Sequence, residues 1–135
     1  MLKKMLKNER GLTLIELLAV VVILGIIAAI AVPAIGGVIQ KSKEDAALSE
    51  ASQIIDASKL YVASKNPTSY PVSLVKTSTK NDLAEYLDKP SDFTLTISKN
   101  GNQLVYTLTG HKVNSAITDF STGATEQQIA DKLKN

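Results

Sequence analysis

The feature that most constrains this chain is an apolar stretch over residues 17–39, 23 residues long, which contains no charged side chain. As an α-helix it would be about 35 Å long, enough to cross the roughly 30 Å hydrocarbon layer of a membrane. Four basic side chains precede it, which favours a cytoplasmic amino terminus and an exported carboxyl-terminal part. These are Lys3, Lys4, Lys7 and Arg10. A plain single-span anchor would share these features, and so would a cleaved secretory signal with its cut near the small residues 28–34.

One carboxylate lies inside this apolar region. Glu16 stands between Ile15 and Leu17, and a carboxylate at bilayer depth costs on the order of 2–3 kcal/mol unless it has a partner. If the chain were cut after Gly11, Leu12 would carry a free α-amino group one helical turn before Glu16. The amine of a neighbouring helix, shifted along the axis by about one turn, could then pair with this carboxylate. Such a pair is strongly attractive where the dielectric constant is low, so it would set the register between subunits.

Residues 11–18 read Gly-Leu-Thr-Leu-Ile-Glu-Leu-Leu and are followed by the long apolar segment and Pro33. This pattern resembles the prepilin signature of type IV pilins and the related pseudopilins, and the resemblance covers about residues 1–40. In that family a membrane aspartic peptidase cuts after the glycine and methylates the new amino terminus. The resemblance therefore implies cleavage between Gly11 and Leu12 and N-methylation of Leu12. Most members have phenylalanine after the cut, where this chain has leucine.

The resemblance also implies roles for residues inside the helix. Glu16 corresponds to the family's conserved acid, and Thr13 and Glu16 are expected at assembly contacts. Pro33 corresponds to the helix-kinking proline. Proline removes a backbone donor and glycine weakens a helix by about 1 kcal/mol relative to alanine. By resemblance, the helix between Gly25 and Pro33 is expected to unwind when a filament is extended.

Beyond residue 40 the apolar residues recur at helical spacing and charged residues fill the other positions. The pattern predicts that the apolar helix continues outward as an amphipathic helix. Asn66-Pro67 ends it, because the residue before a proline is disfavoured in a helix. The apolar positions that we expect to face a core are Ala47, Leu48, Ala51, Ile54, Ile55, Ala57 and Val62.

The remaining residues, 67–135, are expected to form a small head. A Ser-, Thr- and Pro-rich loop is expected over 67–79 and a short amphipathic helix over 81–88. Strict alternation of apolar and polar residues predicts a β-hairpin over 93–109, with its turn at Asn100-Gly101 and its apolar face on the amphipathic helix.

Two further signals lie near the carboxyl end. A weaker alternation around residues 113–120 allows another strand. Thr125 and Gln128 match a capping box, which predicts a short final helix.

These elements predict an α+β fold in which a long amino-terminal helix packs against a small antiparallel sheet, as in pilins. The predicted organisation is a basic leader over 1–11 that is removed, a membrane and filament-core helix half over 12–39, an amphipathic half over 40–66, and the head over 67–135.

Few residues offer chemistry. There is no cysteine, and His111 is the only histidine, so a typical transition-metal site cannot be built. We expect His111 in a surface loop, and Asp82, Glu85 and Asp88 on a solvated helix face. No partnered nucleophile or phosphate-binding glycine loop is evident, and no clustered basic face suggests specific nucleic-acid binding. The sequence predicts no catalytic residue, no metal site and no cofactor, and hence no enzyme.

The expected function is structural: a type IV pilin, held in the membrane before assembly and exposed on the cell surface afterwards. The expected partners are a prepilin peptidase, copies of the same chain in a helical homopolymer, and the membrane-embedded pilus assembly machinery. By resemblance, the uses are adhesion, twitching motility or DNA uptake. Two alternatives stay open, a pseudopilin of a type II secretion or competence system and a signal-anchored extracellular binding domain. The lack of cysteine disfavours pilin subtypes with a disulfide in the head and fits a Gram-positive bacterium.

Overall fold

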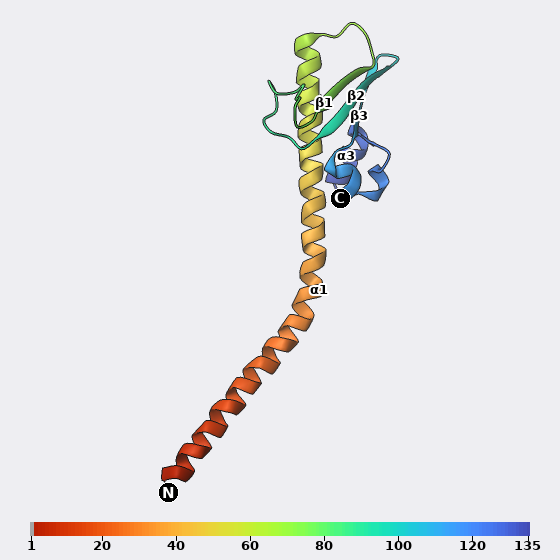
Figure 1. Cartoon of the computed structure of the whole chain (residues 1–135). Coiled ribbons are helices and arrows are strands. Elements are labelled where there is room, and N and C mark those ends of the chain that lie inside the picture. The colour runs from red at the N-terminus through yellow and green to blue at the C-terminus, as the bar shows by residue number, and fades with distance from the viewer. Residues whose placement is uncertain (1) are drawn as a thin grey trace. The chain divides into compact units, whose positions relative to one another are not determined.

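The computed structural model describes residues 2–135, with side chains from Asn8 onward. The chain divides into two compact units, residues 1–40 and residues 41–135. One long helix, α1 (Leu2–Lys65), supplies the first unit and begins the second (Figure 1). The helix ends one residue before Asn66, whose backbone φ of 44° leaves the helical region. The predicted helix end at Asn66-Pro67 is confirmed.

Residues 2–40 of the first unit are all helical. Every side chain over residues 12–30 is exposed, and Ile30 reaches 71 % exposure. By length and composition α1 is able to cross a membrane. No other helix in the described part of the chain is long and apolar enough to do so. A helix suits that setting because all of its internal backbone groups bond within the segment.

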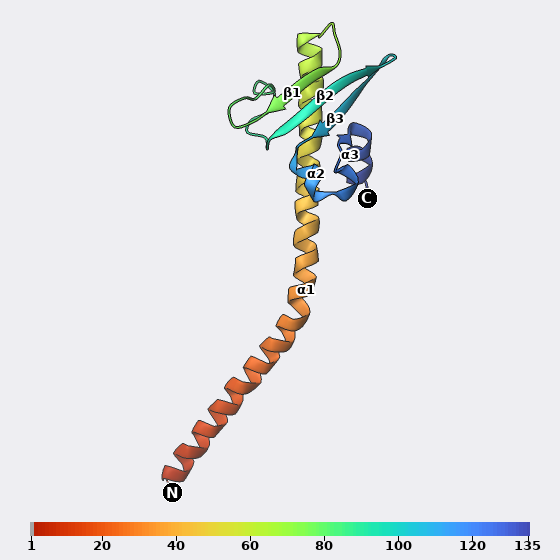
Figure 2. The ribbon, with the colours of Figure 1, turned by 45° about the vertical axis from the view of Figure 1, so that its right-hand side comes forward.

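The second unit packs a four-stranded antiparallel sheet on the outer part of α1 (Figure 2). The strands follow chain order, β1 (Val72–Lys76), β2 (Phe93–Asn100), β3 (Gln103–Thr109) and β4 (Ala124–Thr125). Three short helices complete the head: α2 (Lys112–Ala116), the 3₁₀ helix η1 (Thr118–Phe120) and α3 (Glu126–Leu133). The fold is α+β, as predicted.

The core of this unit follows the sequence patterns. Buried and half-buried residues alternate along β2, with Phe93, Leu95 and Ile97 on the buried side. These side chains share one cluster with buried residues of α1, including Ile54 and Ile55. The predicted β-hairpin and its apolar face on the helix are therefore confirmed. The cluster also includes Ala47, Leu48, Ala51 and Ala57, with Val62 partly buried against it.

Truncating a core side chain tests this packing. Leu95 is fully buried between the sheet and α1, so Leu95→Ala is expected to lower the free energy of unfolding by about 2–5 kcal/mol through lost burial and a residual cavity. The matched control is Leu60→Ala, since Leu60 is 57 % exposed on α1 and its loss should cost less than about 0.5 kcal/mol. Urea unfolding of the full chain in detergent micelles, followed by tyrosine near-UV circular dichroism, compares them. Equal losses would contradict this core.

Two of the elements predicted for the first half of the head are wrong. Residues 72–76 form β1 inside the segment predicted as a loop, because their backbone pairs with β2 from Val72 opposite Ile97 to Lys76 opposite Phe93. No helix forms over residues 81–88, where residues 82–86 form turns. The Asp82 carboxylate accepts a hydrogen bond from the Val75 backbone N–H at 2.8 Å, and side-chain bonds of this kind compete with a helical backbone.

Residues 113–120 form α2 and η1, and the strand suggested there is absent. His111 is the N-cap of α2, and it forms a reciprocal capping box with Asn114. The predicted capping box of Thr125 and Gln128 is confirmed at the start of α3. Immediately before α3 lies the short strand β4, which was not predicted from the sequence.

Candidate functional site

The residues predicted for processing and assembly lie together on α1. Gly11, Leu12 and Glu16 all lie within the helix, so the Gly11–Leu12 peptide bond is part of a helical turn. Leu12 and Glu16 are four residues apart and therefore lie on the same face, about one turn from each other. A Cβ added at Gly11 would meet no atom within 4 Å, so the single chain supplies no packing reason for this glycine.

Thr13 is hydrogen-bonded toward the leader. Its Oγ1 donates to the carbonyl oxygen of Arg10 at 3.0 Å and approaches that of Glu9 at 3.3 Å. Both acceptors lie on the amino-terminal side of the predicted cut. In the intact chain the Thr13 hydroxyl is therefore bonded to residues that processing would remove.

Glu16 is exposed, as are its apolar neighbours Ile15 and Leu17. Its carboxylate has no hydrogen-bond or ion-pair partner among residues 8–135. A single chain thus leaves a charged group unpaired in a helix that is otherwise apolar over residues 12–39. The predicted pairing with a second chain's amine stays a prediction, because one chain cannot contain it.

Gly25 and Pro33 both lie inside α1 in helical conformation. A Cβ at Gly25 would meet no atom within 4 Å. The unwinding predicted between these residues concerns an extended filament and stays a prediction for that state.

Residues 6–32 match a family model described as the prokaryotic N-terminal methylation motif. This segment carries the type IV prepilin signature. The matched range includes Gly11, Leu12, Thr13 and Glu16, and it supports a type IV pilin-like or pseudopilin protein, which is a structural rather than an enzymatic family. It implies processing by a prepilin peptidase and suits a membrane-anchored precursor. No curated protein and no solved structure matches the chain.

The head of this pilin-like chain contains a polar cluster that the sequence reading missed. The prediction of a surface loop for His111 is wrong, because the side chain is fully buried. His111 Nδ1 accepts the Val113 backbone N–H at 3.1 Å, and so Nε2 carries the proton of the neutral ring. Nε2 has no hydrogen-bond partner in the described part of the chain and lies 3.5 Å from Glu50 Oε1. Burial lowers the pKa of His111 despite the nearby Glu50 carboxylate.

Glu50 connects α1 to two other segments of the head. Its Oε1 accepts the Ser91 backbone N–H at 2.6 Å, and its Oε2 forms an ion pair with Lys112. Burial alone would raise the pKa of Glu50, but the hydrogen bonds from Lys112 and Ser91 outweigh it and lower the pKa to about 2. The cluster therefore ties α1 to α2 and to the loop before β2.

The buried imidazole predicts a loss of stability in mild acid. Because the folded state lowers the pKa of His111 below its ordinary value of 6.5, the unfolded chain binds this proton more readily, and stability falls as the pH drops below about 6.5. From pH 7.5 to pH 5.5 the loss is expected to be at most about 1.4 kcal/mol. Glu50 does not contribute in this window, since its folded pKa is about 2 and its unfolded value 4.5.

The control for this effect is His111→Asn, because asparagine keeps a side-chain cap for α2 but does not titrate. Urea unfolding at both pH values should show the loss in the wild type and a smaller one in the variant. Identical pH dependence would contradict the role of His111.

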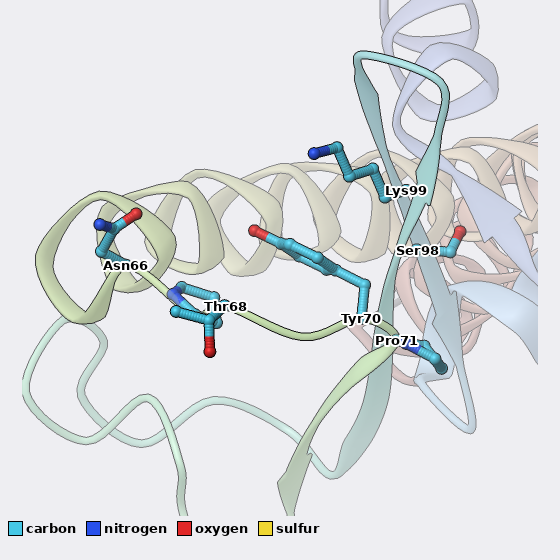
Figure 3. Close-up of a pocket in the computed structure, with 7 residues that line it drawn as sticks. Asn66, Thr68, Tyr70, Pro71, Ser98 and Lys99 are labelled. Carbon is cyan, nitrogen blue, oxygen red and sulfur yellow. The ribbon is translucent and has the colours of Figure 1, made fainter.

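A hollow of about 600 Å³ lies at the outer end of α1 in the head. Figure 3 shows the Tyr70 side chain reaching across it toward Asn66, with Lys99 and Ser98 on the β2 side. The lining residues include neither a carboxylate nor a histidine. Among the residues that the structure describes, no group of three acidic, histidine or cysteine side chains is placed to hold a metal ion. The titratable side chains among the residues lining the hollow are Tyr70 and Lys99.

Proposed function

We propose that this chain is the precursor of a type IV pilus subunit. A prepilin peptidase cuts the Gly11–Leu12 bond and methylates the amine of Leu12, and the processed chain then leaves the membrane for a helical homopolymer on the cell surface. The pilus assembly machinery in the membrane carries out this transfer. Adhesion, twitching motility and DNA uptake are the uses that such a filament supports.

Assembly depends on one charge pair. The free amine of Leu12 from one subunit meets the Glu16 carboxylate of its neighbour. Thr13 follows Leu12 directly in each chain and belongs to the same contact. Either charge alone would be costly in an apolar surround, whereas the pair is attractive there. The apolar side chains of residues 17–39, which contact lipid before assembly, then contact the same segment of neighbouring subunits.

The observation that carries this proposal is the combination of an uncovered helix and an unpaired acid. Over residues 12–39 α1 has apolar side chains on all sides. The described part of the chain buries none of them, and Ala31 alone is partly covered. A carboxylate without a partner stands in the same helix at Glu16. A membrane accommodates the apolar surface, and the amine of a second chain would supply an opposite charge for the carboxylate. The methylation motif at residues 6–32 supports the same interpretation.

Electron microscopy of filaments sheared from cells, with mass spectrometry of their main component, tests the proposal. Long surface fibres composed mainly of this chain, absent after deletion of its gene, are the expected result. If the chain stays in the cell envelope and its deletion blocks protein secretion or DNA uptake without loss of fibres, it is a pseudopilin. If it is found only as a membrane-anchored monomer, the filament proposal is wrong.

A further inference from the structure

Removing the leader changes the environment of the first turn of α1. In an α-helix each N–H bonds to the carbonyl four residues earlier, so the N–H groups of residues 13–15 depend on carbonyls of residues 9–11. A cut after Gly11 removes those three acceptors together. The new helix start then needs other partners for its exposed donors, as every helix amino terminus does.

The residues next to the cut have the sequence of such a cap. Thr13 and Glu16 stand in the Thr-x-x-Glu spacing of a capping box, in which the threonine oxygen accepts the N–H of the glutamate while the carboxylate accepts the N–H of the threonine. Leu12 and Leu17 occupy the two positions that form a hydrophobic staple around this box. Both halves of the motif are therefore present once Leu12 is the first residue.

The intact chain cannot form this cap. Thr13 is an internal helical residue of α1, with helix on both sides of it, whereas an N-cap residue has extended backbone angles. Its hydroxyl is bonded to the Arg10 carbonyl oxygen at 3.0 Å, on the leader side. The Glu16 carboxylate meanwhile has no partner within residues 8–135. In the intact chain, therefore, the Thr13 hydroxyl is bonded to the leader and not to Glu16.

We propose that cleavage converts Thr13 from an internal helical residue into the N-cap of α1 and makes it the positioning residue for Glu16. This inference rests on the proposed cut after Gly11. One carboxylate oxygen of Glu16 accepts the Thr13 N–H, and the other stays available for the amine of a neighbouring subunit. Leu12 lies outside the capped helix, so its amine can reach that neighbour. The cap also gives Glu16 a partner in its own chain while the subunit waits in the membrane.

Nuclear magnetic resonance of the full chain in detergent micelles tests the conversion, comparing the uncut precursor with chain processed by coexpressed prepilin peptidase. The Cα and Cβ shifts of Thr13 are expected to be those of a helical residue before the cut and those of an extended residue after it. After the cut only, Glu16→Ala should change the Thr13 amide shift, because it removes the acceptor of that N–H.

Two variants separate capping from general packing. Thr13→Ser keeps the hydroxyl and should behave as the wild type, whereas Thr13→Val has a similar shape without it and should keep helical shifts after processing. Helical Thr13 shifts in a processed wild-type chain, or the same result for Thr13→Ser and Thr13→Val, would overturn this inference and leave the proposed filament function standing. Amino-terminal sequencing comes first, because a processed chain that does not start at Leu12 would contradict both.

Discussion

Glu16→Ala is expected to reduce incorporation of the subunit into filaments at least tenfold when the variant is coexpressed with the wild-type chain. In the proposed filament the variant would leave the amine of a neighbouring Leu12 buried without its carboxylate, and breaking one side of a buried pair costs about 3–5 kcal/mol. Because Glu16 lies five residues beyond the predicted cut, the leader should still be removed. Quantitative mass spectrometry of sheared filaments gives the ratio of the two chains.

The matched control is Glu9→Ala, which removes a carboxylate from the same helix on the leader side. The filament would not contain this residue, so the variant should incorporate as the wild type does. If Glu16→Ala chains enter filaments in proportion to their synthesis, the charge pair is unnecessary for assembly.

Gly11→Leu is expected to leave almost all of the chain uncut in the membrane. The Gly11–Leu12 bond lies in a helical turn, and a peptidase has to unwind that turn and approach its backbone. Glycine makes both easier, because it lowers helix stability by about 1 kcal/mol relative to alanine and has no side chain to obstruct the approach. Immunoblots of membrane fractions separate precursor from processed chain by their difference of 11 residues.

Gly25→Leu is the control, since Gly25 is also helical and an added Cβ there would meet no atom within 4 Å. It should be cut normally. Normal removal of a leader from Gly11→Leu would place the cut at another residue. Leu12 would then have no free amine, which contradicts the role proposed for it.

The elements predicted correctly from sequence are those that strong local patterns specify. The hairpin of β2 and β3 combines alternating residues on both sides of a turn at Gly101, whose φ of 62° suits glycine. The final helix begins at a full capping box of Thr125 and Gln128. The long helix combines a continuous apolar segment with apolar residues at helical spacing up to Lys65.

The elements missed depend on contacts from distant parts of the chain. β1 has five residues and pairs with β2, which lies about 20 residues later. Its own sequence therefore contains little that indicates a strand. The turns over residues 82–86 include Asp82, whose carboxylate accepts a hydrogen bond from the Val75 backbone N–H of β1. His111 is buried beside Glu50 of α1, a residue 61 positions earlier in the chain. A weak local signal existed, the asparagine three residues after His111 that completes the cap of α2.

The processing residues were predicted entirely from sequence, and the motif match at residues 6–32 now supports the type of protein. The structure adds the hydrogen bonds of Thr13 to the leader and the absence of a partner for Glu16 in residues 8–135. A single chain does not contain the neighbour that would pair with Glu16.

The most direct test of the account is the intact mass and amino-terminal sequence of the chain recovered from surface filaments. The account predicts a product that begins at N-methylated Leu12 and retains all later residues. A product that begins at Met1 retains the basic leader, and one that begins near Gly36 lacks the apolar helix. Either of these would contradict the account.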